Sequence, residues 1–246
     1  MKKLFVIPFL FFMSLGFISC QDDGEPVYYF WDEPALVETL GSAGPLIKTP
    51  HGKFTAPNLA EKGINKGDVL WTNFYVDMDK QANRDSLVAT VFRYIKLEGK
   101  KATLPQTAET FKELLNDDYT EPFRLAELYN VYIDRYLFFG FYHNDKNKMH
   151  TYEIVCNPEI EAPNGHPTLY IRAREDSSPV LFWEGKENNK IIAAFDMTEF
   201  LDKYGVTISG GAKAVKFNLK YKIGTSAEGK DIYREFMSNP ITWSAK

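Results

Sequence analysis

VKFNLKYKI, residues 215–223, alternates apolar and polar side chains without interruption. Successive side chains of a strand point to opposite faces, so the apolar positions of this stretch share one face and the polar positions share the other. A period of two is typical of a strand that packs one face on a core and exposes the other to water. The stretch therefore predicts a protein built mainly from antiparallel β-strands.

The same period recurs along the chain. It predicts two more long strands, one through Leu70, Thr72, Phe74, Val76 and Met78, and one through Leu87, Ala89, Val91, Ile95 and Leu97 with Arg93 as a polar break. Shorter strands are predicted at 27–31, 35–40, 53–56, 123–133, 168–174 and 230–236. A helix is expected at 107–116, where Thr110 and Glu113 have capping-box spacing. A second helix should follow Asp196 as its N-cap and end at Gly205.

A polar stretch at 98–105 separates two parts of the chain. About five short strands precede it, which suits a small closed barrel such as the OB-fold. Roughly seven or eight strands follow it, which suits a β-sandwich. We expect an all-β protein with an OB-like barrel at 27–104 and an antiparallel β-sandwich at 105–246, and a break between the domains that falls between Leu97 and Phe123.

Residues 1–19 have the layout of a secretory signal peptide. Two lysines precede an apolar run at 4–18, which is too short to span a bilayer but suits a signal peptide. The run ends at Phe17-Ile18-Ser19-Cys20, the pattern of a lipoprotein box with a bulky first residue. Cleavage before Cys20 would leave its thiol carrying a diacylglycerol, and several acyl chains hold a protein firmly to a membrane. The alternative is ordinary secretion, with Cys20 left inside the signal.

Residues 20–26 are expected to form a short lipidated tether. Asp22, Asp23 and Glu25 make it acidic, and a segment of this composition stays solvated. It resembles the acidic stretch behind the lipid-bearing cysteine in surface-exposed lipoproteins of the Bacteroides group, and a plain flexible linker is the alternative. We therefore expect a protein that is lipid-anchored in the outer membrane and exposed at the cell surface.

Charge and cysteine content narrow the function classes. Removal of residues 1–19 deletes two lysines and lowers the formal net charge from −4 to −6. A chain this acidic lacks the basic surface that phosphate backbones require, so nucleic acid is not expected as a partner. With Cys20 lipidated, Cys156 has no cysteine to pair with, and no internal disulfide is possible.

Oxygen-bearing side chains occupy alternate positions at the end of the strand predicted at 70–78. They are Asp77, Asp79, Gln81, Asn83 and Asp85, an arrangement similar to the first part of an EF-hand calcium loop. That loop also needs Gly at its sixth position and Glu at its twelfth, where this chain has Ala82 and Val88. A solvated hairpin loop is the favoured interpretation.

Two histidines, His143 and His150, flank a predicted hairpin. A symmetric register would pair them and would place Phe141 opposite Tyr152, but a zinc site normally needs a third protein ligand. Cys156 ends an apolar strand, as a small buried hydrophobe does. The chain has neither a Gly-x-Ser-x-Gly elbow nor a phosphate-binding glycine loop. We therefore predict no catalytic residue, no metal site and no cofactor.

Four tryptophans, Trp31, Trp71, Trp183 and Trp243, are the remaining candidates for a binding site. An exposed indole ring can stack on a sugar, whereas a buried one fills a core. Trp183 is the best candidate for a sugar-stacking platform, because a polar loop at 184–189 follows it. The solvent exposure of the four indoles decides between the two interpretations.

Diffuse strand motifs along the chain form a family pattern. Besides the signal with Cys20, they are Gly67-Asp68-Val69-Leu70, residues 136–142, His150-Thr151-Tyr152, Leu169-Tyr170-Ile171-Arg172 and residues 194–198 before the alternating strand. Together they resemble the NigD-like lipoproteins of the Bacteroides group over nearly the whole mature chain, although Ala173 stands where the family pattern has a His. The resemblance implies an N-terminal OB-like domain, a C-terminal β-sandwich, an envelope location and a loose association with bacteriocin gene clusters. It carries over no functional residue.

These observations favour a non-catalytic envelope lipoprotein with a binding or assembly role in the outer membrane. Lipid on Cys20 makes the membrane one partner, and a protein or a glycan is the other. One alternative is a carbohydrate-binding accessory protein of a surface glycan-uptake system, which should present a strip of exposed aromatic rings. Another is a glycan hydrolase with an unrecognised carboxylate site, which should bring two acidic side chains together in a cleft.

The substitution Cys20→Ala should release the protein from the membrane fraction, because no thiol remains to take the diacylglycerol. Cell fractionation and a mass spectrum of the mature N-terminus measure this. Ser19→Ala keeps a small residue before the cysteine, should leave the anchor intact and is the matched control. An unmodified N-terminus downstream of Cys20 in the wild type would contradict the prediction.

Overall fold

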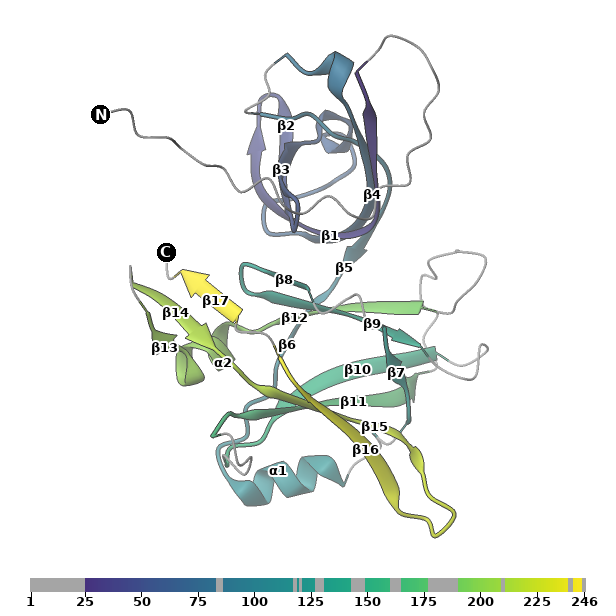
Figure 1. The fold of residues 1–246 in the computed structure, drawn as a ribbon, viewed down its shortest axis with the longest axis vertical. Coiled ribbons are helices and arrows are strands. Elements are labelled where there is room, and N and C mark those ends of the chain that lie inside the picture. Colours follow the sequence, from purple (N-terminus) through teal and green to yellow (C-terminus); the bar gives the residue numbers. More distant parts are fainter. Residues whose placement is uncertain are drawn as a thin grey trace, which may run out of the picture.

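The structure, a computed structural model, describes residues 25–82, 86–116, 119, 121–126, 131–142, 149–159, 165–176, 190–208, 211–238 and 241–244. Of the structure, 58% is strand and 12% is helix, which confirms the predicted all-β class. Among these described residues, no helix is long and apolar enough to cross a membrane. The fold is therefore organised by its sheets, which form an upper and a lower half in Figure 1.

Five antiparallel strands form the N-terminal half, at the top of Figure 1. They are β1 (Val27–Gly41), β2 (Gly44–Thr49), β3 (Gly52–Thr55), β4 (Val69–Asp77) and β5 (Thr90–Leu97), in the spatial order β3-β2-β1-β4-β5. Two 3-10 turns, η1 (Pro57–Leu59) and η2 (Met78–Lys80), lie in the connections on either side of β4. The segments predicted as separate strands at 27–31 and 35–40 are one long strand, β1.

This five-stranded sheet curls until its two edges meet. The N–H of Thr55 donates to the carbonyl of Leu87 at 3.0 Å, and the N–H of Ala89 donates to the carbonyl of Thr55 at 2.8 Å. A parallel bridge of two hydrogen bonds, rather than a strand ladder, thus joins β3 to the segment before β5. This half-open form is typical of an OB-fold, so the predicted OB-like topology is present. The prediction of a fully closed barrel is wrong. The interior holds Ala35, Val37, Ile47, Phe54, Leu59, Leu70, Phe74, Val76 and Val91.

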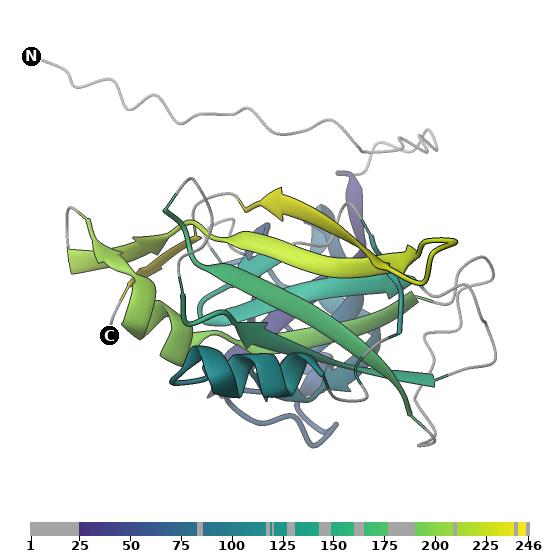
Figure 2. The same ribbon diagram turned by 90° about the horizontal axis from the view of Figure 1, so that it is seen from below.

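Two sheets packed face to face form the C-terminal half (Figures 1 and 2). The first contains, in spatial order, β10 (Met149–Cys156), β11 (Thr168–Asp176), β15 (Asn218–Thr225) and β16 (Asp231–Met237). The second contains, in spatial order, β6 (Gly99–Lys101), β12 (Lys190–Asp196), β9 (Tyr136–Tyr142) and β7 (Arg124–Leu125), with β8 (Val131–Ile133) also pairing with β9. Side chains from both sheets share one apolar core, so the predicted β-sandwich is present.

Smaller elements surround the sandwich. A third sheet contains β13 (Val206–Thr207), β14 (Ala212–Val215) and β17 (Ile241–Ser244). The helix α1 (Ala108–Leu115) packs against the outer side of β10 and β11, and α2 (Thr198–Tyr204) adds to the sandwich core. The cap of α1 is Thr107, whose Oγ1 accepts the N–H of Thr110 at 3.2 Å, so the predicted capping role of Thr110 is wrong.

The alternating stretch at 215–223 changes partners in its middle. It is split between β14, which ends at Val215 and pairs with β17, and β15, which begins at Asn218 and pairs with β11 and β16. Its apolar positions up to Tyr221 are buried as predicted. Ile223 is 42% exposed, because the register between β15 and β16 shifts between Lys222 and Gly224 and leaves Ile223 as the extra residue of a bulge.

The apolar positions predicted to share one face of β5 are divided between two faces. The register between β4 and β5 shifts between Asn73 and Phe74, which marks a bulge. A bulge adds one residue to a strand and reverses the faces of the residues beyond it. Val91 therefore packs inside the barrel, whereas Ile95 and Leu97 pack on its outside, against the C-terminal half.

The outer face of β4 joins the two halves of the molecule. Val69 and Trp71 point away from the barrel interior and pack with Ile133, Tyr136 and Phe138 of the second half. Trp71 is only 1% exposed, so β4 is buried on both faces at this end. This apolar junction holds the barrel against the sandwich.

Polar pairing also crosses between the halves. Lys48 Nζ lies 2.5 Å from Asp134 Oδ1, which links β2 to the turn between β8 and β9. The residues of β6 pair in parallel with β12, so in strand pairing they belong to the second half. The division into domains at residue 104 stays a prediction.

The substitution Trp71→Ala should lower the free energy of unfolding by about 3–5 kcal/mol, the usual cost of deleting a large buried aromatic side chain. Urea unfolding followed by circular dichroism measures the loss. Val206 is 68% exposed, so Val206→Ala should change the same quantity by less than about 0.5 kcal/mol. A loss below about 1 kcal/mol for Trp71→Ala would show that the junction contributes little.

Candidate functional site

Four aromatic rings gather on the outer face of the barrel, on strands β1, β4 and β5. We call them the aromatic patch: Tyr29, Trp31, Tyr75 and Phe92. Tyr29, Trp31 and Phe92 are 53%, 61% and 47% exposed, although large aromatic side chains usually lie inside. A contiguous apolar surface of this kind marks an interaction site in soluble proteins.

The rings contact one another as a continuous surface. The Tyr29 and Trp31 rings lie nearly parallel, with centroids 6.2 Å apart. Phe92 meets Trp31 edge to face at 5.2 Å and lies 6.4 Å from Tyr75, which in turn lies 5.6 Å from Tyr29. Each ring therefore supports two neighbours, and the patch keeps its shape without a ligand.

Two β-bulges lie beside these rings. The register between β1 and β4 shifts after Phe30, so that Trp31 and Asp32 together lie opposite the single residue Asn73. On the other side of β4, the bulge beyond Asn73 leaves Phe92 as the extra residue of β5. Bulges bend a strand and re-aim its side chains, and they are frequent beside functional sites.

Asn73 holds the centre of this arrangement. Its side-chain Oδ1 accepts the backbone N–H of Asp32 at 2.7 Å, and the residue is only 4% exposed. Asp32 adopts a φ of 57°, a left-handed conformation that is uncommon for residues other than glycine but tolerated by aspartate. The hydrogen bond that Asp32 donates to Asn73 stabilises this turn of the backbone, and the turn positions Trp31.

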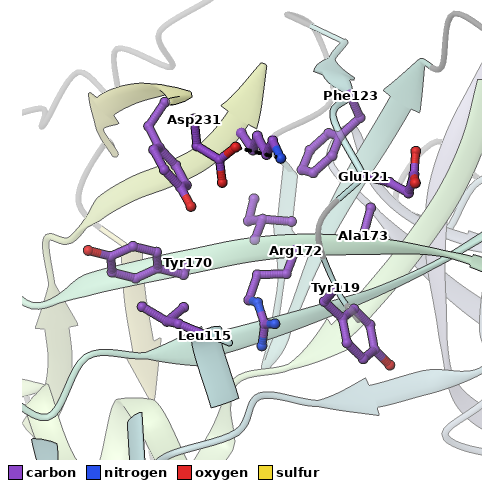
Figure 3. A pocket seen from close by; sticks show the side chains of 11 residues that line it. Leu115, Tyr119, Glu121, Phe123, Tyr170, Arg172, Ala173 and Asp231 are labelled. Carbon is purple, nitrogen blue, oxygen red and sulfur yellow. Dashed lines mark ion pairs between the residues drawn. The ribbon is translucent and has the colours of Figure 1, made fainter. Parts of the chain in front are cut away.

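A second concave surface lies on the sandwich, where α1 approaches β11 and β16 (Figure 3). It encloses about 390 Å³ of empty space, part of it open to solvent. Arg172, at its base, is 6% exposed and lies 2.6 Å from Glu153, and Lys222 lies 2.7 Å from Asp231 at its rim. The cations of this hollow are thus already engaged by carboxylates of the same chain. The aromatic patch is the stronger candidate site.

The structure separates the four tryptophans. Trp31 is exposed in the patch. Trp71 is buried at the junction, so the suggestion that it stacks on a sugar is wrong. Trp183 and the side chain of Trp243 lie outside the described residues. So does Cys20, with the first residues of the tether.

The predicted hairpin between the two histidines is wrong. β9 pairs with β7, β8 and β12 and β10 pairs with β11, so the two segments lie in different sheets. Phe141 and Tyr152 do contact each other, but their rings stack at 3.7 Å across the sandwich core. His150 is buried opposite Glu175 of β11, and His143 lies outside the described residues. Among the described residues, no three His, Cys, Asp or Glu side chains gather as metal ligands would.

Sequence reasoning identified Trp31 but not the other three rings of the patch. Tyr29 shares the face of Trp31 by simple alternation, and the run of four aromatic residues at 28–31 was a usable signal. Tyr75 and Phe92 come from distant strands, and Phe92 is the extra residue at the bulge of β5. The series from Asp77 to Asp85 was predicted to be a loop. Its described part contains the 3-10 turn η2, and Asn83 and Asp85 lie outside the described residues.

Solved structures of proteins from the Bacteroides and Parabacteroides groups share this fold. A NigD-like immunity protein from Bacteroides caccae has a TM-score of 0.52 at 10% identity, over 90% of this chain and 100% of that chain. A candidate lipoprotein from Bacteroides fragilis has a TM-score of 0.54 at 13% identity, over 87% and 97%. An uncharacterized protein from Parabacteroides merdae has a TM-score of 0.52 at 19% identity, over 87% and 99%.

No protein-family model matches the sequence, and no curated protein matches it. The similarity therefore lies in the three-dimensional structure. At this level the predicted resemblance to the NigD-like proteins is confirmed.

The substitution Asn73→Ala should lower the free energy of unfolding by about 1–3 kcal/mol, because the N–H of Asp32 loses its acceptor. Asn65 is exposed, so Asn65→Ala should cost less than about 0.5 kcal/mol and is the matched control. Urea unfolding measures both, and near-ultraviolet circular dichroism follows the packing of the rings. Equal losses in the two variants would show that Asn73 does not hold the bulge.

Proposed function

We propose that this chain is a lipid-anchored, non-catalytic protein of the bacterial cell envelope that acts by binding through the aromatic patch. The single observation that carries the proposal is the set of exposed rings presented by two bulges around Asn73. A core does not need these rings, because the barrel interior is filled by other residues. Their exposure is explained by a partner that covers them.

The envelope location is supported by sequence and by fold. Residues 1–19 have the features of a signal peptide, and Cys20 stands where a lipoprotein carries its lipid. Fold neighbours include a candidate lipoprotein and a NigD-like immunity protein, which agrees with a role in the envelope. The acidic tether at 20–26 supports an outer-membrane, surface-exposed position.

The state of Cys156, a free and buried cysteine, supports a binding role over catalysis. Burial raises the pKa of the Cys156 thiol to about 11, so the thiol is protonated at neutral pH and is a poor nucleophile. The acidic residues of the hollow in Figure 3 include Asp231, which is paired with Lys222. This ion pair engages Asp231 within the chain.

Carbohydrate binding, as an accessory protein of a surface glycan-uptake system, is the second candidate function. The same rings favour it, because exposed Trp31 and Tyr29 offer flat apolar faces to a sugar. This function shares the location and the surface of the first proposal and differs only in what covers the patch.

A photo-crosslinking phenylalanine analogue at position 92 should capture an envelope component in living cells, because the patch is covered there. The same analogue at position 206, which is also exposed but lies on β13, is the matched control and should capture nothing specific. Mass spectrometry of the adduct identifies a lipid, a glycan or a protein. Equal and unspecific labelling at the two positions would contradict binding through the patch.

The non-catalytic part of the proposal has a separate test. Purified mature protein should hydrolyse no polysaccharide, ester or peptide substrate. Turnover of a polysaccharide that is lost in Glu121→Gln or in Asp231→Asn would instead support a glycan hydrolase acting at the hollow, whose lining includes both residues.

A further inference from the structure

We propose that the aromatic patch rests on the membrane surface to which lipid on Cys20 ties the chain. The inference depends on the proposed anchor and adds a second contact to it. In this arrangement the acyl chains attach the protein, and the rings of the patch settle at the boundary between headgroups and hydrocarbon. The barrel then has one defined orientation on the bilayer.

The length of the tether brings the patch to the membrane. Val27, where β1 begins, lies seven positions after Cys20 in the sequence. An extended chain covers at most about 3.6 Å per residue, so the start of β1 stays within about 25 Å of the lipidated residue. Tyr29 and Trp31 follow on the same strand, about 7 Å and 13 Å further along. The patch is thus the exposed apolar surface that the anchor reaches first along the chain.

The fold leaves this part of the barrel uncovered. On the outer face of β4, Trp71 lies under the second half of the molecule, whereas Tyr75, four residues further along, lies in the patch. The distance between the two positions is about 13 Å along the strand. One end of the same sheet face is therefore covered by the sandwich, and the other end is exposed beside the anchored terminus.

The chemistry of the rings suits a lipid interface. Trp and Tyr combine an apolar ring with a polar N–H or O–H, and both are enriched where headgroups meet hydrocarbon. Phe92 and Val27, which is 41% exposed two residues before Tyr29, add purely apolar surface. Close to Val27, Asp77 pairs with Lys80 at 2.7 Å, so this part of the rim carries a neutralised pair. Insertion of rings, rather than attraction to anionic headgroups, would hold the barrel.

The polar groups of the patch fit a lipid surface better than a sugar. A specific sugar site places fixed polar side chains around its aromatic rings to bind hydroxyl groups. The polar side chain at the centre here, Asn73, is almost fully buried, and its Oδ1 already accepts the N–H of Asp32. Asn73 Oδ1 is therefore engaged within the chain, and the surface around it is formed mainly by the aromatic rings, with Arg93 opposite Asn73 on β5.

Fluorescence quenching of Trp31 tests the inference. Lipidated protein is reconstituted into phosphatidylethanolamine–phosphatidylcholine vesicles with or without brominated acyl chains, and the difference between the wild type and Trp31→Phe isolates the emission of Trp31. Brominated lipid should reduce this emission roughly twofold or more, and the vesicles should shield it from aqueous iodide. The buried Trp71 is the matched control, because the difference between the wild type and Trp71→Phe should not respond to brominated lipid.

The outcomes separate failure of the anchor from failure of the patch. Protein that lacks lipid on Cys20 by mass spectrometry and does not float with vesicles would overturn the anchor. Coupling a maleimide lipid to Cys20 of the mature chain then tests the patch alone, because Cys156 is buried and its raised pKa keeps it unreactive. Vesicle-bound protein whose Trp31 remains open to iodide and unaffected by bromine would overturn the inference. So would a soluble polysaccharide that shields Trp31 in the absence of vesicles, since this would identify the patch as a glycan site.

Discussion

Burial of both faces of β4 is the constraint on which the rest of the structure depends. On its inner face, Leu70 and Phe74 fill the barrel, and on its outer face Val69 and Trp71 fill the junction with the sandwich. A strand of this kind tolerates a polar side chain only where its hydrogen bonds are satisfied, and the hydroxyl of Thr72 donates to the carbonyl of Glu33 at 3.0 Å. β4 therefore contributes side chains to the barrel core and to the junction with the sandwich.

The outer face of β4 also explains where the candidate site lies. Beyond Trp71 the strand leaves the junction, and at Asn73 both neighbouring strands contain bulges. A bulge interrupts the ladder of backbone hydrogen bonds, and the Asn73 side chain replaces one of them by accepting the N–H of Asp32. Residue type does not distinguish the structural Trp71 from the candidate binding residue Trp31. The two differ in their surroundings, because the second half of the molecule covers Trp71 and leaves Trp31 exposed.

Hydrophobic period predicted the all-β class and most strand positions, because each buried face leaves a direct trace in the sequence. The period could not predict which strands pair. The segments 137–143 and 150–156 have the pattern of a hairpin, yet β9 and β10 lie in different sheets, and the rings of Phe141 and Tyr152 stack across the core between them. The bulge of β5 left one trace, the polar Arg93 in the series from Leu87 to Leu97, but a single polar break does not show that the extra residue Phe92 reverses the faces of the strand.

The short tether determines how strong the patch contact has to be. A flexible linker of a few residues holds its ends together at an effective concentration in the millimolar range, so a contact with a dissociation constant of about that size is half occupied. On a chain anchored as proposed, the exposed rings would therefore suffice for a membrane contact, although the formal net charge without residues 1–19 is −6. In the proposed arrangement the lipid would provide attachment and the patch would provide orientation. With the barrel against the bilayer, the opposite end of the molecule, with α1 and β16, would point away from it (Figure 1).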